Sequence, residues 1–282
     1  MSDASDLLSR VKAEILKTGY PTQVRLADFL QRELWGVVQS PAYLDDVEGI
    51  SREYDLRAYR EWTVAGTSPP FLIGVYLIIE CKKSDKPWVF FTTEATHLRG
   101  RLGELIRGKV ADKIVFATRN SSAAYLTDDD LLSFHHYFRG ARLAHSYFEP
   151  FKGKDPRDAS PTIFSAMLSC TKPTLFLHKD RPIERWLRIH YPVVVFDGQL
   201  LDARIREDGE IELVRVPSLI VEFSYMAPNP SPRTQSWENE ERFYIDVVSS
   251  QGVRDFAKAL ESDHEAMANM LAAKFAVKPG SA

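Results

Sequence analysis

Two carboxylates and a lysine in the first third of the chain have the spacing that a metal-dependent hydrolytic site requires. Glu80 and Lys82 stand at the end of the apolar run Phe71–Cys81, and residues two apart on an extended chain point to the same face. Asp55 lies in the segment YDLRA, between two apolar residues. Antiparallel pairing of the two segments would bring both carboxylates to one edge of a sheet. Such a pair can hold Mg²⁺ and leave it water ligands for attack on a phosphodiester.

Cys81, between Glu80 and Lys82, is expected to point to the opposite face, where an apolar packing side chain belongs. Its backbone carbonyl can still bind the metal ion, so it is a third candidate ligand beside Asp55 and Glu80. The Lys82 ammonium can reach the scissile phosphate or the attacking water. A run as apolar as FLIGVYLII therefore ends in charged residues because it ends at a site.

The elements that must position these residues follow from the apolar pattern. Helical spacing predicts one helix through Leu16 and a second from about Thr22 to Leu34, after a break at Gly19-Tyr20-Pro21. The continuous apolar run predicts a strand that is covered on both faces, at the centre of a sheet. The expected order is helix, three strands, helix, strand, with the strands over Trp35–Ser40, Ile50–Trp62 and Phe71–Cys81, the next helix over Leu98–Gly108 and the last strand over Lys113–Thr118.

With its Asp and Glu-x-Lys residues, this order resembles the PD-(D/E)xK phosphodiesterase superfamily over about the first 120 residues. The layout is most similar to archaeal Holliday-junction resolvases and Mrr-type restriction enzymes. The resemblance implies an α/β fold, with a restriction-endonuclease-like mixed β-sheet flanked by helices. It also implies that Asp55 and Glu80 bind Mg²⁺, for which Mn²⁺ can substitute, and that Lys82 helps to activate water.

The chain departs from the family pattern at two positions. Tyr54 stands where many members have proline. Many members also carry a carboxylate on the first helix, about eleven residues before the first strand, and that spacing falls near Gln23. The Gln23 amide could hydrogen-bond a water on the metal but would add no charge. Glu33 is the acidic alternative on the same helix.

The second half of the chain is predicted to be a C-terminal α+β extension. The polar loop FKGKDPRDASP separates a nuclease-like core at 1–150 from the extension at 151–282, whose role is unknown. Whether the extension belongs to the same domain is left open, and no second catalytic site is expected in it. Its acidic residues lie around a predicted hairpin, where charge normally serves solubility: Asp197, Asp202, Glu207, Asp208, Glu210 and Glu212. Its predicted elements are a helix over Thr162–Cys170, strands in YPVVVFDGQLLDARI, IELVRVPSLIVEFSYM and RFYIDVV, and a closing helix from Val253.

Composition limits the classes of function. The 282 residues, 44% hydrophobic and 27% charged, describe a soluble globular chain with material for one large domain or two modest ones. Its longest apolar run is far shorter than the roughly 20 residues of a membrane-spanning helix, and its N-terminus is amphipathic and charged, so a cytoplasmic location is expected. The net charge of −3 provides no global basic field, so nucleic-acid binding requires a local patch. Neither cysteine has zinc-site spacing.

Other candidate residues are better explained by structure. Asp45, Asp46 and Glu48 could be further ligands, but a solvated loop is the preferred interpretation. His135 and His136 stand among aromatic residues, which favours packing over a metal or general-base role. A basic run after the motif could contact phosphates of the substrate: Lys83, Lys86, Arg99, Arg101, Arg107 and Lys109.

The expected function is therefore that of a Mg²⁺-dependent endonuclease acting on DNA, in restriction, repair or defence. The alternative is a non-catalytic nucleic-acid-binding or assembly module that retains the fold. The expected partner is DNA and not a membrane, with a homodimer left open. Duplex, junction, single strand, RNA and modified DNA all remain open as substrates.

Overall fold

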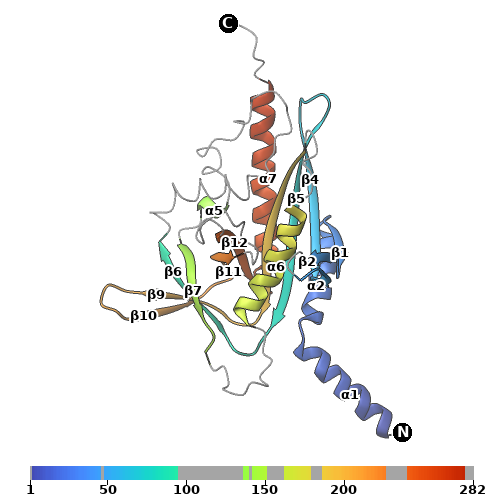
Figure 1. Cartoon of the computed structure of the whole chain (residues 1–282), viewed down its shortest axis with the longest axis vertical. Coiled ribbons are helices and arrows are strands. Elements are labelled where there is room, and N and C mark those ends of the chain that lie inside the picture. Colours follow the sequence, from blue (N-terminus) through green and yellow to red (C-terminus); the bar gives the residue numbers. More distant parts are fainter. Residues whose placement is uncertain are drawn as a thin grey trace.

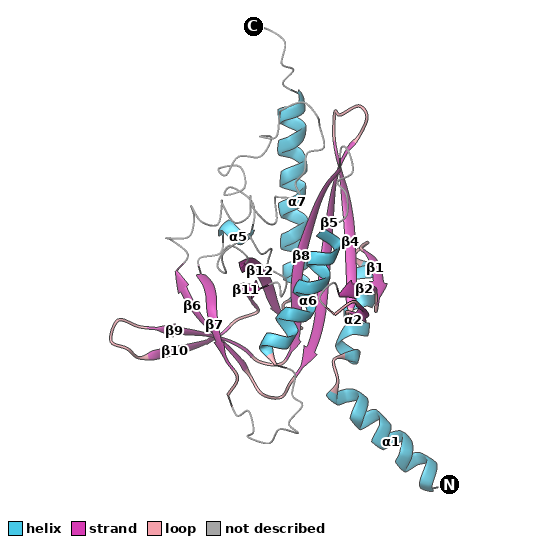
Figure 2. Ribbon diagram, viewed as in Figure 1, coloured by secondary structure: helices cyan, strands magenta, loops and turns pink. Residues whose placement is uncertain are grey.

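The structure is a computed structural model, and it describes residues 2–45, 48–94, 136–139, 142–150, 162–178, 186–226 and 240–276. It shows an α/β protein in which helices flank a large mixed sheet (Figures 1 and 2). Ten of the described strands form this sheet, in the order β1-β4-β5-β8-β12-β11-β7-β6-β9-β10. The strands β2 and β3 form a separate two-stranded sheet. No described helix has the length and apolar character needed to cross a membrane.

The described elements have the following bounds. The helices are α1 Ser2–Lys17, α2 Tyr20–Arg32, α5 His136–Arg139, α6 Ile163–His178 and α7 Val253–Ala276. The first six strands are β1 Gly36–Gln39, β2 Ala42–Asp45, β3 Ile50–Glu53, β4 Leu56–Val64, β5 Phe71–Lys83 and β6 Trp88–Glu94. The others are β7 Arg142–Phe148, β8 Trp186–Asp197, β9 Leu200–Ile205, β10 Ile211–Arg215, β11 Ser218–Met226 and β12 Glu240–Ser249.

The strand β5 lies inside the sheet, as its apolar sequence predicts. It pairs antiparallel with β4 on one side and parallel with β8 on the other. Helices α2 and α7 cover one face, where Leu26 and Leu260 join Ile79 in one apolar cluster. Helix α6 covers the other face, where Met167 packs with Val194. Both faces of the central strands are therefore buried.

The helices near the N-terminus agree closely with the sequence pattern. Helix α2 begins at Tyr20, two residues before the predicted start, and Pro21 stands in its first turn, a position where its missing N–H costs nothing. Its buried residues include Leu26, Ala27 and Leu30, at helical spacing. Helix α1 projects away from the sheet in Figure 1.

The strand predicted over Ile50–Trp62 is two strands. β3 ends at Glu53 and pairs with β2, whereas β4 begins at Leu56 and joins the large sheet. Tyr54, at the bend between the two strands, packs in a cluster with Tyr43, and their ring centroids are 6.1 Å apart. Asp55 therefore precedes β4 and does not lie within a strand, which corrects the sequence interpretation. The strands β2, β6 and β7 were not predicted.

The two halves of the sequence contribute to one sheet. β8 pairs with β5 from Leu72↔Trp186 to Lys83↔Asp197, and α6 precedes it. The parallel strand beside β5 is thus a strand of the second half, although Lys113–Thr118 was predicted to be the next strand of the fold. Both Leu98–Gly108 and Lys113–Thr118 lie outside the described residues, as does the loop at 151–161. A division at residue 150 does not separate two sheets.

Candidate active site at the end of β5

The residues predicted to do chemistry meet where β4 begins and β5 ends. Leu56 is the register partner of Ile79, so Asp55 and Glu80 are the next residues along these antiparallel strands. The Asp55 carboxylate accepts a hydrogen bond from the Cys81 backbone N–H, at 2.6 Å from Oδ2. The Lys82 ammonium donates to Oε1 of Glu80. The structure thus brings Asp55, Glu80 and Lys82 together at one end of the strand.

Burial makes the ionised form of both carboxylates less favourable. Glu80 is only 6% exposed, and burial, reinforced by the neighbouring Asp55 charge, raises the pKa of Glu80 to about 7 although Lys82 opposes the shift. Burial also raises the pKa of Asp55, against the Cys81 N–H and the Lys82 charge. Burial by itself would lower the pKa of Lys82, but Glu80 and Asp55 outweigh it and the pKa is raised. The lysine therefore stays an ammonium at neutral pH.

Cys81 packs on the α2 face, as the alternation predicts. Its side chain is buried in the apolar cluster with Leu26 and Val195, and burial raises the pKa of its thiol well above the ordinary value. A Cβ added to Gly19 would lie 2.6 Å from the Cys81 carbonyl oxygen. Gly19 is thus required by this close approach, and it covers the proposed carbonyl ligand from the side of α2.

Gln23 has a different contact from the one expected. Its Nε2 donates to the backbone carbonyl of Asp55 at 2.9 Å, and the residue is 4% exposed. The amide nitrogen therefore holds the backbone of Asp55. It does not bond to the carboxylate of Asp55 or Glu80. The acidic alternative, Glu33, caps the opposite end of α2, where its carbonyl accepts a hydrogen bond from Arg60.

The oxygen donors at this site fit Mg²⁺ better than a softer metal. Two carboxylates and a backbone carbonyl are the hard ligands that Mg²⁺ prefers. Within the described residues, hydrogen bonds engage Oδ2 of Asp55 and Oε1 of Glu80, which leaves one oxygen of each carboxylate for a cation. A divalent cation would also offset the repulsion between the two charges. The described part of the chain contains no cluster of three or more His, Cys, Asp and Glu residues arranged to hold a metal.

Asp45 is not part of a solvated loop, contrary to the sequence interpretation. It is 3% exposed and forms ion pairs with Lys172 at 2.7 Å and Arg52 at 3.1 Å. Glu48 pairs with Arg52, and Asp46 lies outside the described residues. These contacts attach β2 and β3 to α6, because the lysine stands on that helix. Asp45 and Lys172 are far apart in the sequence, so no local pattern predicts that they pair.

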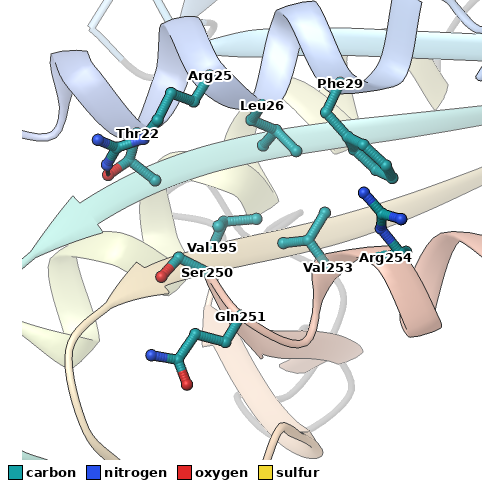
Figure 3. A pocket seen from close by; sticks show the side chains of 9 residues that line it. All are labelled: Thr22, Arg25, Leu26, Phe29, Val195, Ser250, Gln251, Val253 and Arg254. Carbon is teal, nitrogen blue, oxygen red and sulfur yellow. Dashed lines mark hydrogen bonds between the residues drawn. The ribbon is translucent and has the colours of Figure 1, made fainter. Parts of the chain in front are cut away.

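Asp197 is a nearby polar centre that the sequence analysis placed only in a solvent-exposed hairpin. Its carboxylate accepts hydrogen bonds from Thr22 and Ser250, each at 3.0 Å. Arg25 approaches it at 3.4 Å and Lys83 at 3.9 Å. Asp197 is the register partner of Lys83, and its partners Thr22, Arg25 and Ser250 line the cavity shown in Figure 3. The sequence signal that could have identified Asp197 is its position as a charged residue at the end of a buried strand, as for Glu80.

Of the predicted basic run, Lys83 makes this contact with Asp197 and Lys86 donates its backbone N–H to Ser84. The remaining four members, Arg99, Arg101, Arg107 and Lys109, lie outside the described residues.

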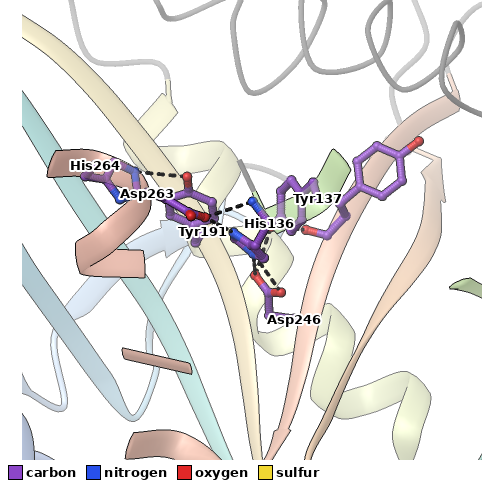
Figure 4. A network of polar contacts seen from close by, with 7 residues as sticks. His136, Tyr137, Tyr191, Asp246, Asp263 and His264 are labelled. Atoms are coloured by element: carbon purple, nitrogen blue, oxygen red, sulfur yellow. Dashed lines mark hydrogen bonds and ion pairs between the residues drawn. The ribbon is translucent and has the colours of Figure 1, made fainter. Parts of the chain in front are cut away.

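His136 belongs to a buried polar network in addition to an aromatic cluster (Figure 4). Its Nε2 lies 3.1 Å from Asp246 and its Nδ1 lies 3.3 Å from Asp263, and the Tyr137 hydroxyl also donates to Asp246. Burial opposes protonation, but the two carboxylates raise the pKa of His136 to about 9. Packing was the expected role, and the aromatic contacts with Tyr137 and Tyr191 agree with it. The carboxylate partners were missed, and His135 lies outside the described residues.

This network borders a cavity of about 410 Å³, lined by both apolar and charged side chains. Asp202, Arg142 and Arg204 line another part of it, and the Arg204 guanidinium donates to Asp202 at 2.7 Å. The sequence placed Asp202 among residues that serve solubility, but it is 3% exposed. The expectation that charge in this region only serves solubility is therefore wrong for Asp202.

No family model matches the chain, and neither curated proteins nor solved structures include a significant match.

Proposed function

We propose that the chain is a Mg²⁺-dependent endonuclease that hydrolyses phosphodiester bonds in DNA. The observation that supports this best is the meeting of Asp55, Glu80 and Lys82 at the end of a buried central strand. Two carboxylates with raised pKa values beside an ammonium form an arrangement that costs stability, and such sites are commonly functional. The antiparallel strands β1, β4 and β5, followed by the parallel β8, suit the restriction-endonuclease-like fold that the proposal includes.

Asp55, Glu80 and the Cys81 carbonyl are the groups proposed to hold the metal, with Mn²⁺ as a substitute for Mg²⁺. When bound, the ion polarises the phosphate and makes water a stronger nucleophile at neutral pH. The protein fixes the ligands in advance: the Cys81 N–H orients the Asp55 carboxylate, and Gln23 holds the Asp55 backbone. Preorganised charges of this kind lower the reorganisation required during the reaction.

Lys82 is proposed to stabilise charge on the phosphate. An ammonium has three N–H donors, and the bond to Glu80 uses one of them. The other donors can serve a phosphate oxygen as negative charge develops on it. Its side chain is 23% exposed, so it is partly shielded from water yet accessible to a substrate. Glu80 thus has two functions, as a metal ligand and as the residue that positions Lys82.

The experiment incubates the purified chain with duplex, junction, single-stranded and RNA substrates. Each is supplied with Mg²⁺, with Mn²⁺ or with a chelator. Cleavage of at least one substrate is expected with metal and not with the chelator. Binding without cleavage under every condition would instead support the non-catalytic nucleic-acid-binding module.

Substitution of Lys82 tests the chemistry itself. Lys82→Ala is expected to slow cleavage by about 100-fold or more, the usual loss when a charge-stabilising donor is removed. DNA binding should change only a few-fold, because one cation among several phosphate contacts contributes little of the affinity. The matched control is Lys12→Ala, at an exposed position on α1, which should cut at the wild-type rate. An equally fast Lys82→Ala variant would end the catalytic assignment.

A further inference from the structure

A cavity of about 280 Å³ lies between α2 and the start of α7 (Figure 3). Its wall includes Val195, the register partner of Cys81 on β5. Because Cys81 points away from Glu80 and Lys82, the cavity and the active site occupy opposite faces of the same strand ends.

One end of the cavity is built for a flat ring. The Arg254 guanidinium lies over the Phe29 ring, 5.7 Å from its centroid, and Figure 3 shows these two side chains side by side. Leu26, Val195 and Val253 add buried apolar surface. Aromatic rings and guanidinium planes are the groups on which unpaired nucleobases stack, whatever the base.

The cavity also favours negative charge. Its lining residues include Arg25 and Arg254 but no carboxylate, and the charge around it stays net positive when Asp197, which contacts Arg25, is included. Arg25 is 65% exposed, and its contact with Asp197, at 3.4 Å, is long. The Arg25 guanidinium can therefore turn to a phosphate without leaving a buried charge unpaired. Lys83 adds a third cation where β5 and β8 end.

We infer that this cavity receives an unpaired nucleobase of the DNA strand that is cut, with Arg25 and Arg254 binding its phosphates. The inference rests on the proposed function, because the cavity lies at the same strand ends as that site, on the other face of the sheet. A cavity of about 280 Å³ between α2, β8 and α7 has room for one base, and stacking on Phe29 requires that this base is unpaired. The substrate of the proposed nuclease is therefore DNA with a single-stranded segment next to the cleavage position.

Binding measured without divalent metal tests this separately from cleavage. The wild-type chain in chelator is titrated against a labelled single-stranded oligonucleotide and a blunt duplex of the same sequence, and fluorescence anisotropy reports the affinity. Phe29→Leu keeps apolar packing but removes the ring. It should weaken single-strand binding by about 5- to 150-fold, the range for loss of one stacked base. Duplex binding should stay within about twofold of wild type, because phosphate contacts alone dominate it.

Conservative and distant variants separate stacking from other effects. Phe29→Trp retains an aromatic surface and should keep single-strand affinity. Arg254→Ala should weaken single-strand binding in the same direction as Phe29→Leu. The controls are Phe164→Leu, at a phenylalanine 49% exposed on α6, and Arg206→Ala, at an exposed arginine after β9. Neither should change the preference for single strands. Thermal unfolding of every variant checks that it is folded.

Three results would overturn the inference: unchanged single-strand binding in Phe29→Leu, an equal loss for duplex and single strand, or no binding of single strands by the wild type. The proposed function fails differently. If the chain cuts blunt duplex with Mg²⁺ but shows no Phe29-dependent binding, the proposed nuclease activity stands and the base-binding role of the cavity is wrong. If the chain binds single strands through Phe29 but cuts nothing, the base-binding role of the cavity stands and the proposed nuclease activity is wrong.

Discussion

Asp55 and Glu80 oppose the stability of the fold at the position where the proposed chemistry requires them. Each raised pKa means that the ionised carboxylate is less favourable in the folded chain than in water. Destabilising groups are commonly retained at functional sites, where proteins give up stability for activity. The free energy of unfolding should therefore respond to removing either charge.

Asp55→Asn is expected to abolish cleavage and to stabilise the metal-free protein by about 1 kcal/mol. The asparagine oxygen can still accept the Cys81 N–H, while the repulsion with Glu80 disappears. Thermal unfolding in chelator measures the gain. Added Mg²⁺ should raise the Tm of the wild type and not that of the variant, because ligand binding stabilises only the form that binds it. A variant less stable than wild type in chelator would show that the carboxylate is not destabilising.

Gln23 is expected to act through the backbone and not through the metal. Gln23→Ala removes a buried hydrogen bond to the Asp55 carbonyl, which should cost about 1–2 kcal/mol in unfolding free energy. That carbonyl also accepts the Ser40 N–H, so it keeps one partner. The Mg²⁺ concentration for half-maximal cleavage should stay within about twofold of wild type. A large rise in that concentration would assign Gln23 to the metal site. The control is Gln31→Ala, at an exposed position of α2.

At the scale of elements, His136 joins three parts of the fold that are distant in sequence. It stands at the start of α5, Asp246 is on β12 and Asp263 is on α7. Asp246 and Asp263 are almost fully buried, so an uncompensated charge there would be costly. The protonated imidazole neutralises part of that charge and holds α7 to the sheet.

Stability should consequently fall in alkaline solution. The pKa of His136 is raised to about 9 in the folded chain, above the ordinary value of about 6.5. The stabilisation is complete below about pH 6.5 and is lost as the pH rises through 9, with a total of about 3 kcal/mol. Chemical denaturation between pH 6 and pH 9.5 measures this slope. His136→Gln should flatten it, and an unchanged slope in that variant would assign the pH dependence to other groups.

At the scale of the whole molecule, the two halves of the chain depend on one another. β5 is paired along most of its length with β8, a strand of the second half, and α6 and α7 cover the two faces of the sheet. The candidate active site lies at the ends of β5 and β8, so both halves shape it. The second half is therefore part of the structure that holds the site.

A fragment of residues 1–150 is expected not to fold independently. Without β8 and α7, the buried strand β5 would expose one hydrogen-bonding edge and an apolar face, which favours aggregation. Circular dichroism and size-exclusion chromatography of the fragment would show disordered or aggregated chains, with the full chain as the control. A monomeric fragment with cooperative unfolding would instead establish residues 1–150 as an independent domain.

The sequence by itself determined some of the local elements and the residues of the candidate site. Periodicity defined α1 and α2, the apolar run defined β5, and the charges at its end identified Glu80 and Lys82, because these signals lie within a few neighbouring residues. Only the tertiary structure decided the bend at Tyr54, the neighbour of β5 and the partners of Gln23, Asp45 and His136. Each of these depends on contacts between residues far apart in the chain. A pairing such as Asp45 with Lys172 or Cys81 with Val195 exists only once the sheet has been assembled, so no short pattern in the sequence encodes it.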